Sequence, residues 1–407
     1  MSVIIKNTKG TVFEGCDFVV QLPDTRRNDA KILQITDMQV IDSSQRRQPD
    51  RIRPDEIAAW DPENFDVQCG NHIRSLVAQS TPDLIIITGD IVYGSFDDSG
   101  ETLRWMCSLM DSFEIPWAPV FGNHDNESKK GVTWQCEQFE NSKYCLFKRG
   151  NVSGNGNYTV GVAVGNELIR TIHMLDSNGC KDGDDPSIIK TPGIYNDQLS
   201  MISDNTAKIL NSQGRMIPSF LAFHIPTEQF LEAERAKGYA CENTDYYAIG
   251  VNTPAKDGDF GFRYKIHSDI FKTGVDFIDF LKNQGVGGVF VGHVHGACTR
   301  ILYQDIVWVY GLKTGQYDSH IPYGLGGTEI TLIGDRFNIR HIPSLVQPAP
   351  MPEKAPMFKD FFAKSDCHYA RFKIACHANY NRIDIPDSKT GDNLCIGHVR
   401  AFAYGQI

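Results

Sequence analysis

The stretch of residues 83–94, DLIIITGDIVYG, constrains the fold more than any other part of the chain. Its apolar run, bounded by Pro82 and Gly89, has the length of a strand, and it predicts an interior strand of a sheet covered on both faces. Open sheets bind their ligands beyond the carboxyl ends of such strands, where Asp90 and Tyr93 fall. Alone, an aspartate in this place more often caps the next helix or turn, so it indicates a site only together with others like it.

Similar strands recur along the chain, separated by stretches with the spacing of amphipathic helices. Residues 1–30 are expected to form short N-terminal edge strands. Further strands are expected at residues 32–36, 117–121, 169–175, 218–223, 288–291, 301–310 and 328–333. Helices are expected at residues 64–80, 102–113, 199–210 and 276–283, and residues 228–272 are interpreted as an insertion near the site. The succession of strand, helix and strand predicts an α/β fold.

The composition is that of a large globular chain, because 41% of the 407 residues are hydrophobic and 22% are charged. The net charge of -10 argues against a nucleic-acid surface, although bound metal ions would still allow an anionic substrate. The sequence shows no signal peptide and no apolar run long enough for a membrane span, so we expect a cytoplasmic protein without membrane contact. The 11 cysteines include no CxxC pair, which predicts reduced, buried thiols.

A change in composition near the C-terminus predicts where the main domain ends. Residues 346–356 are rich in proline and are expected to form a semi-rigid linker, so the main domain should span residues 1–345. Residues 357–407 form a C-terminal extension whose cysteines and histidines lack the spacing of a zinc module. We therefore expect this extension to pack against the main domain.

Polar residues of one kind follow five of the expected strands: Asp37, Asp90, Asn123 with His124 and Asp125, His224, and His293 with His295. A His-x-His pair alone is commonplace, and Asp176, after another strand, is interpreted as a turn residue. Five such ends meeting at one sheet edge form a set of imidazole, carboxylate and amide ligands that suits Mn, Fe or Zn. Because these ligands outnumber what one ion needs, they predict two ions that share a carboxylate.

The order and spacing of these residues resemble the calcineurin-like metallophosphoesterase superfamily over residues 30–345. The motifs that carry the resemblance are Asp37-x-Gln39, Gly89-Asp90-x-x-Tyr93, Gly122-Asn123-His124-Asp125, His224 and Gly292-His293-x-His295. Most of that superfamily has histidine where this chain has Gln39. Purple acid phosphatases also lack that histidine and use a tyrosine at the place of Tyr93, so the chain is most similar to a purple-acid-phosphatase-like branch.

The resemblance implies a four-layer fold in which two mixed β-sheets pack face to face between helices. It also implies two divalent or mixed-valence ions, Fe, Mn or Zn. One ion would bind Asp37, Asp90, His295 and either Tyr93 or Gln39. The other would bind Asp90, Asn123, His224 and His293.

For the chemistry, the resemblance implies in-line attack of a metal-bound hydroxide on phosphorus. His124 would stand beside the leaving oxygen, and Asp125 would hold the orientation of the imidazole ring. The expected substrate is a phosphate ester, either a small molecule or a phosphoprotein, and a monoester is favoured over a diester.

Two other functions remain open at this stage. A catalytically silent scaffold of the same fold would bind a protein partner, and Gln39 together with the unusual C-terminal extension favours it. The retention of His124 and Asp125 counts against it, because a scaffold needs neither. A single-metal oxygenase would also use histidine and carboxylate, but it does not account for paired sites at Asp90 and Asn123.

Overall fold

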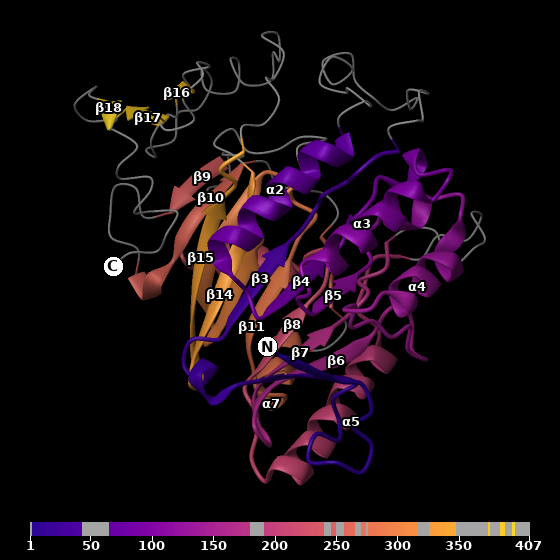
Figure 1. Cartoon of the computed structure of the whole chain (residues 1–407). Helices are drawn as coiled ribbons and strands as arrows, with labels where there is room; N and C mark the ends of the chain where they lie inside the picture. The colour runs from indigo at the N-terminus through magenta and orange to yellow at the C-terminus, as the bar shows by residue number, and fades with distance from the viewer. Residues whose placement is uncertain are drawn as a thin grey trace.

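The structure is a computed structural model of the whole chain (Figure 1). It describes residues 2–42, 65–179, 191–239, 246–249, 256–264, 270–273, 276–315 and 325–346, together with three short strands nearer the C-terminus. These strands are β16 (Lys373–Ile374), β17 (Ile383–Pro386) and β18 (Asn393–Leu394). Apart from residue 346 and these strands, the predicted linker and C-terminal extension lie outside the described residues. The domain limits therefore stay predictions.

A five-stranded sheet carries the stretch that constrains the fold. Its order is β15 (Arg336–Pro343), β14 (Gly326–Ile333), β3 (Lys31–Ile35), β4 (Leu84–Thr88) and β5 (Trp117–Val120). Strands β3, β4 and β5 are parallel, whereas β14 runs antiparallel to β3 and to β15. Every residue of β4 is buried, as expected for an apolar run in the interior of a sheet.

A ten-stranded mixed sheet packs against the first. In order across the sheet, its strands are β1 (Val3–Ile5), β2 (Phe18–Leu22), β6 (Tyr158–Val164), β7 (Glu167–Met174), β8 (Ser219–Ala222), β11 (Val286–Val291), β13 (Ile306–Tyr310), β12 (Ala297–Tyr303), β10 (Phe260–Tyr264) and β9 (Tyr246–Ile249). Strands β7, β8, β11 and β13 are parallel neighbours. The expected N-terminal edge strand is confirmed, because β1 pairs only with β2 at the margin of this sheet.

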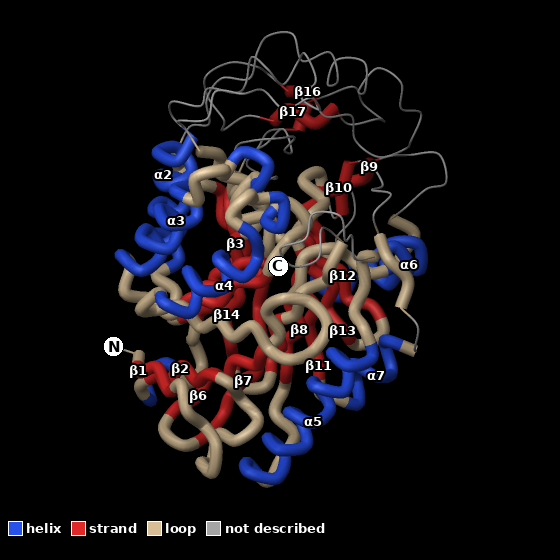
Figure 2. The backbone as a smooth tube through the Cα atoms, turned by 90° about the vertical axis from the view of Figure 1, so that its right-hand side faces the viewer, coloured by secondary structure: helices blue, strands red, loops and turns tan. Residues whose placement is uncertain are grey.

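Helices cover the outer face of each sheet (Figure 2). The α-helices are α2 (Phe65–Ser80), α3 (Glu101–Ser112), α4 (Gly131–Asn141), α5 (Asn196–Gln213), α6 (Glu228–Ala236) and α7 (Phe277–Asn283). Short 3-10 turns are η1 (Asp24–Arg26), η2 (Gly94–Phe96), η3 (Asp125–Glu127) and η4 (Lys256–Gly258). Helix α2 contacts β3, β14 and β15, whereas α5, α6 and α7 contact β7, β12 and β11. The predicted four-layer arrangement is therefore confirmed.

The alternation of side chains along β8 shows how one strand serves two hydrophobic layers. Phe220 and Ala222 belong to the core between the two sheets. Leu221 and Phe223 belong to the second core, which the outer helices cover. Because successive side chains of a strand point to opposite faces, a strand buried on both sides is apolar at every position.

Three segments differ from the sequence-based expectation. Residues 301–310 were expected to be one strand, but they span parts of β12 and β13, which pair antiparallel as a hairpin. Gln304 and Asp305 form the turn, with φ of 54° and 63°, which is the backbone that two-residue hairpins require. Strand β15 was missed, and the insertion at 228–272 contributes α6, β9 and β10.

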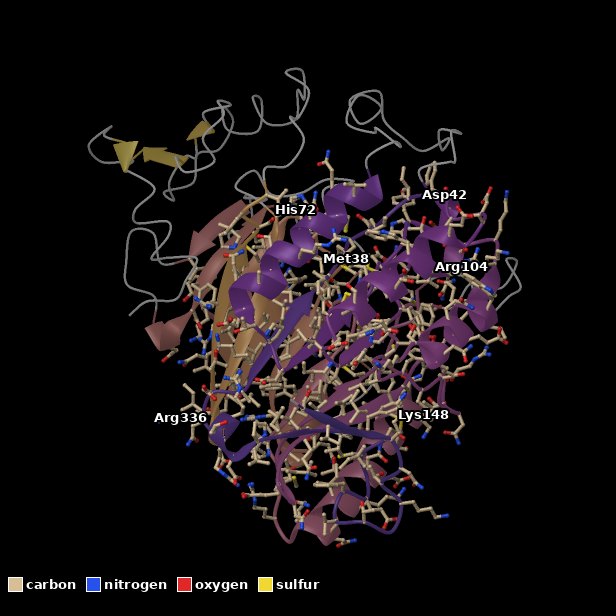
Figure 3. All side chains as sticks on the ribbon, in the orientation of Figure 1. Met38, Asp42, His72, Arg104, Lys148 and Arg336 are labelled. Carbon is tan, nitrogen blue, oxygen red and sulfur yellow. The ribbon has the colours of Figure 1, made fainter. Side chains whose placement is uncertain are left out.

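Charged side chains generally lie at the surface and apolar side chains lie inside, as expected for a large globular chain. Arg104, Lys148 and Arg336 lie at the periphery of the molecule, whereas Met38 lies inside it (Figure 3). The cysteines with a described environment are buried, as predicted: Cys16, Cys69, Cys107, Cys136, Cys145 and Cys298. Among the helices in the described parts of the chain, none is both long and apolar enough to cross a bilayer.

Candidate metal centre

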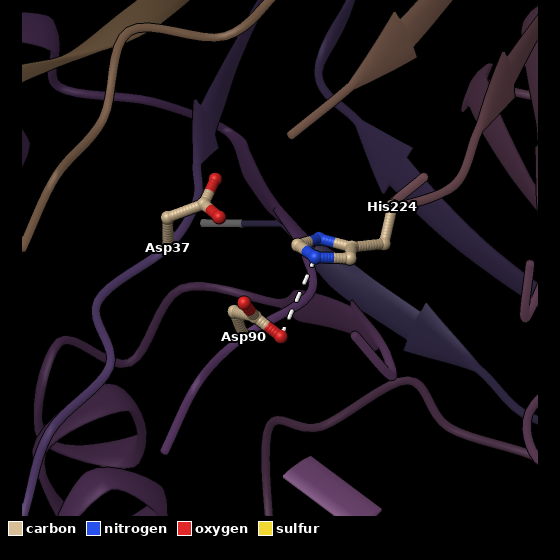
Figure 4. Close-up of side chains that lie close together, drawn as sticks. All are labelled: Asp37, Asp90 and His224. Carbon is tan, nitrogen blue, oxygen red and sulfur yellow. Dashed lines mark ion pairs between the residues drawn. The ribbon is translucent and has the colours of Figure 1, made fainter. Parts of the chain in front are cut away.

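Five strands from the two sheets deliver polar residues to one place. Asp37, Asp90, His224 and His293 each stand two residues beyond the end of β3, β4, β8 and β11, and Asn123 follows β5. Ligand atoms of Asp37, Asp90 and His224 lie within 4.8 Å of one another, and all three residues are buried. Figure 4 shows these three side chains pointing toward a common point. The predicted convergence of strand ends is therefore present.

The backbone is strained where it turns these residues toward the centre. Asp37, Gln39, Asp90 and His293 have φ of 52°, 47°, 51° and 70°, in the left-handed region that residues with a Cβ avoid. Each such residue costs on the order of 1 kcal/mol, which the surrounding packing must offset. Strain gathered on neighbouring residues at strand ends is typical of a functional site.

Two glycines allow the chain to pass close to the carboxylates. A Cβ at Gly122 would lie 2.2 Å from Asp90 Oδ1, and one at Gly292 would lie 2.1 Å from Thr36 Oγ1 and 2.7 Å from Asp37 Oδ2. Neither position can hold a larger residue without displacing a group of the centre.

Three donor atoms surround the outer nitrogen of His224 and form a set of four with it. Its Nε2 lies 3.1 Å from Asn123 Oδ1, 3.4 Å from Asp90 Oδ1 and 3.3 Å from His293 Nδ1. An ion held about 2.1 Å from each donor keeps neighbouring donors about 3.0 to 3.4 Å apart, so this set fits one metal ion. The other ring nitrogen, Nδ1, donates to the Thr88 carbonyl at 2.7 Å and leaves Nε2 to the centre.

The charges of the centre favour a cation at this point. Burial, the largest influence, lowers the pKa of His224, but the carboxylates of Asp90 and Asp37 outweigh it and raise the pKa to about 9. Burial likewise raises the pKa of Asp90, yet His224 and His124 hold it well below its usual range. Buried negative charge thus demands positive charge beside it, as a proton or as a metal ion.

A second set of donors lies around Asp37. His295 Nε2 is 3.2 Å from Asp37 Oδ1, and the His293 amide donates to both carboxylate oxygens at 3.1 Å. The Thr36 hydroxyl donates to Oδ2 at 2.7 Å. Burial raises the pKa of Asp37, but the hydrogen bond from His295 and the charges of His224, His295 and Lys313 together lower it to about 2.

Gln39 has a partner that the sequence did not indicate. Lys313 is buried, and its Nζ donates at 2.7 Å to Gln39 Oε1 and at 2.7 Å to the Asp37 carbonyl. The amide nitrogen of Gln39 points to Asp90 Oδ2 at 3.4 Å. Lys313 stands three residues beyond the end of β13, so a polar residue after that strand was the only available signal.

His124 lies between an aromatic ring and a carboxylate. Its ring stacks on Tyr93 with centroids 4.5 Å apart, and Tyr93 also meets Phe96 edge to face at 5.5 Å. The His124 amide donates to Asp90 Oδ1 at 2.9 Å, and Nδ1 lies 3.0 Å from Glu127 Oε2. Glu127 was not among the residues that sequence reasoning selected.

Asp125 does not hold the His124 ring, so that expectation was wrong. Its Oδ1 accepts from the Val92 amide at 2.9 Å, and its Oδ2 accepts from the Gly122 amide at 2.7 Å. Burial, followed by the charge of Asp90, raises the pKa of Asp125 to about 7. Asp125 therefore fastens the loop after β5 to the loop after β4, and Glu127 supplies the ring contact.

Asp176 is a turn residue, as interpreted from the sequence. Its carboxylate accepts from the amides of Asn155 at 2.7 Å and Asn178 at 2.8 Å. Both bonds link backbone segments, so they account for its burial.

Comparison with known sequences identifies relatives of this chain. The family model described as calcineurin-like phosphoesterase matches residues 30–297. A protein of Arabidopsis thaliana named probable inactive purple acid phosphatase 29 is 26% identical over 65% of this chain and 66% of its own length. An uncharacterized protein of Schizosaccharomyces pombe is 27% identical over 56% of this chain and 43% of its own. The phosphatase DCR2 of Saccharomyces cerevisiae is 28% identical over 46% of this chain and 34% of its own length. The chain thus spans between about a third and two thirds of these relatives.

Comparison with solved structures finds phosphatases. A dimetal phosphatase from Danio rerio aligns over 78% of this chain and 97% of its own, with a TM-score of 0.46 and 13% identity. A purple acid phosphatase from yellow lupin seeds aligns over 80% of this chain and 54% of its own, with a TM-score of 0.40 and 11% identity.

Proposed function

The chain belongs to the calcineurin-like phosphoesterase family, and from this membership we propose that it is a two-metal phosphoesterase that hydrolyses phosphate esters, monoesters in preference to diesters. The observation that carries the proposal is the set of donors at metal-ligand spacing around His224 Nε2. The proposed substrate is a small phosphate ester or a phosphoprotein.

In this proposal two ions share one carboxylate, that of Asp90. One ion would be held by Asp90, Asn123, His224 and His293. The other would be held by Asp37, Asp90 and His295. Tyr93 is proposed as its further ligand in place of Gln39, whose amide oxygen accepts from Lys313. Bound Fe, Mn or Zn ions would acidify a water molecule and neutralise the charge of the phosphate.

His124 is proposed to assist the leaving group. Glu127, at 3.0 Å from Nδ1, accepts its hydrogen and so fixes the tautomer and orientation of the ring. The ring can then give a proton from Nε2 to the oxygen that leaves phosphorus, which converts an alkoxide into an alcohol. Stacking on Tyr93 holds the ring plane during this transfer.

Metal content and hydrolysis of an aryl phosphate test the proposal together. Protein supplied with excess Mn²⁺ should carry about two ions per chain and cleave the monoester faster than the diester. Asp90→Ala should lose both ions and lower the rate by roughly a thousandfold or more, because it removes the shared ligand. Asp24→Ala, at a surface carboxylate with a 90% exposed side chain, is the matched control and should change neither property. A folded protein that binds no ions and cleaves neither ester would contradict the proposal.

The visible spectrum tests the role of Tyr93. Ferric iron bound by a phenolate absorbs in the visible range, so an iron-loaded protein should be coloured and Tyr93→Phe should lose the colour. An active, colourless protein that contains zinc or manganese would exclude the version with iron bound by the Tyr93 phenolate and leave the phosphoesterase proposal standing.

A silent scaffold that binds a protein partner is the second candidate. Gln39 replaces the histidine common in the superfamily, and relatives in Arabidopsis thaliana are named probable inactive. Ion binding without hydrolysis of any phosphate ester offered would favour this candidate over the enzyme.

A further inference from the structure

The ammonium of Lys313 is a cation of the centre that the two-metal assignment does not use. It is buried, with 1% of the residue exposed, and it follows β13 at the same sheet edge as the ligands. Its Nζ donates at 2.7 Å to the Asp37 carbonyl and at 2.7 Å to Gln39 Oε1, and both acceptors lie on the loop after β3. Lys313 therefore stands on the Asp37 side of the centre, away from the donors around His224.

The contact with Lys313 fixes which end of Gln39 faces the ligands. An ammonium has only donors, so the atom of the Gln39 amide beside it must be the oxygen. The amide nitrogen then faces Asp90 Oδ2, at 3.4 Å. An amide N–H cannot bind a metal ion, and here it faces an oxygen of the carboxylate that the two ions would share.

The two sites of the centre therefore differ in their ligands. The site around His224 has four donors, from Asp90, Asn123, His224 and His293. The site around Asp37 has Asp37 and His295, paired at 3.2 Å, and a share of Asp90. With Tyr93 as its proposed fourth ligand this site equals the other in number, but the fixed positive charge of Lys313 lies beside it and weakens the binding of a cation there.

We propose that Lys313 makes the Asp37 site the weaker of the two, so that the centre keeps one ion at the His224 site and takes up the second only as the free metal concentration rises. This inference rests on the proposed function. Activity would then follow metal supply, because hydrolysis needs both ions. Lys313 also supplies positive charge to the buried Asp37 loop when the second ion has left, which preserves the fold of the centre.

Metal titration of the full chain tests this proposal without any measurement of activity. Protein stripped with a chelator is titrated with Mn²⁺ alone, and bound ions are counted by equilibrium dialysis and elemental analysis. The wild type should fill in two steps that differ roughly a hundredfold in affinity, the upper range of effects that a metal site's surroundings produce. Lys313→Met should tighten the weak step roughly tenfold or more and leave the tight step nearly unchanged.

Two further variants control the titration. Lys148→Met removes the same charge from a surface ion pair with Asp17 and should leave both steps as in the wild type. Gln39→His supplies an imidazole where most of the superfamily has one and should also tighten the weak step roughly tenfold. If circular dichroism shows that Lys313→Met does not fold, Lys313→Gln carries the test, because it removes the charge and keeps a hydrogen-bond donor for the Asp37 carbonyl.

The outcomes separate this proposal from the proposed function. Two ions bound with equal affinity by the wild type, or a weak step unchanged in the folded variants, would overturn the role of Lys313 and leave a two-metal enzyme standing. A wild type that binds no Mn²⁺ in a folded state would overturn both.

Discussion

The imidazole of His124 is placed by a residue three positions further along the chain, not by its neighbour in the motif. His124 is the N-cap and Glu127 the last residue of the 3-10 turn η3. Side chains at i and i+3 of such a turn lie above one another, and Nδ1 of His124 is 3.0 Å from Glu127 Oε2. In the sequence motif Asp125 is the neighbour of His124, which predicts a contact with the ring. Its side chain turns inward instead and accepts two backbone amides.

Glu127→Gln should therefore alter catalysis with little effect on stability. Glutamine can still accept the hydrogen of Nδ1, but it lacks the charge that raises the basicity of the ring. We expect kcat to fall roughly tenfold with a nearly unchanged KM, and the alkaline limb of the pH profile to move down by up to about one pH unit. Steady-state kinetics with an aryl phosphate between about pH 5 and 9 measure both effects.

Asp125→Asn is the matched comparison. Asparagine has one acceptor oxygen where the carboxylate has two, so one of the amides of Gly122 and Val92 loses its partner. Thermal unfolding should show a loss of about 1 to 3 kcal/mol, without a shift of the pH profile. If Asp125→Asn moved the pH profile and Glu127→Gln did not, the original assignment of the ring contact to Asp125 would be restored.

At the scale of elements, Arg170 on β7 joins the two sheets. Its Nη2 donates to the carbonyls of Gly334, Asp335 and Arg336 in the turn between β14 and β15, at 3.2, 3.1 and 3.4 Å. The guanidinium also lies 4.8 Å from the Phe220 ring centroid. One buried side chain of the ten-stranded sheet thus holds the end of a hairpin of the five-stranded sheet.

Arg170→Met should weaken the contact between the sheets. The apolar chain keeps the packing but loses hydrogen bonds from a charged donor, so we expect a loss of about 2 to 3 kcal/mol in urea unfolding. The stability of Arg170→Lys should lie between that of the wild type and that of Arg170→Met, since an ammonium cannot reproduce the planar fork of the guanidinium. Arg215→Met, at a surface arginine with a 39% exposed side chain that also approaches Asp335, should cost less than about 1 kcal/mol. Equal losses of stability in Arg170→Met and Arg215→Met would contradict the role of Arg170 in joining the sheets.

A second element-scale prediction concerns His173, buried on β7 with Nδ1 3.0 Å from Thr159 Oγ1. Burial lowers its pKa to about 4. The unfolded chain therefore binds a proton near the ordinary histidine value, about 6.5, before the folded chain does. Stability from this histidine is complete above that value and is lost as pH falls toward 4. The loss is about 2 kcal/mol near pH 5.

The contribution of His173 is isolated by comparing the wild type with His173→Asn. Other groups titrate in the same range, and His224, whose pKa is raised, works in the opposite direction. The variant should be less stable at about pH 7.5, but its stability should decline by roughly 2 kcal/mol less than that of the wild type between there and about pH 5. If the wild type and His173→Asn lost the same stability between the two pH values, a buried neutral His173 would be ruled out.

The strands and helices that the sequence predicted correctly are those whose hydrophobic pattern can be recognised within a few neighbouring residues. Strand β4 and helix α2 follow from an apolar run and an amphipathic spacing that need no partner to be recognised. The hairpin of β12 and β13 was missed because its turn at Gln304 and Asp305 contains no glycine. β15 was missed because half of its positions are polar, and its place is set by pairing with β14.

At the scale of the whole molecule, the centre is a junction between the sheets. Strands β3, β4 and β5 of one sheet and β8, β11 and β13 of the other all end there. The sequence predicted that these strand ends meet, because their polar residues follow the strands within a few positions. It could not predict the contact of Lys313 with Gln39, which joins residues 274 positions apart. Such a contact depends on how the sheets pack, which no local pattern records.

This arrangement predicts that metal ions stabilise the whole fold. Asp37, Asp90 and Asn123 come from the five-stranded sheet, and His224, His293 and His295 come from the other, so a bound ion cross-links the two. An ion present at about a hundred times its Kd should add about 2.7 kcal/mol to the free energy of unfolding. Adding a chelator should therefore lower the midpoint of thermal unfolding by a few degrees, and returning Mn²⁺ should restore it.

His224→Ala removes a ligand of the tighter site and should make the midpoint insensitive to the chelator. A midpoint that ignores the chelator in wild-type protein shown to carry ions would mean that the ions do not join the sheets. The strain at Asp37, Asp90 and His293 would then have to be offset by packing and hydrogen bonds alone.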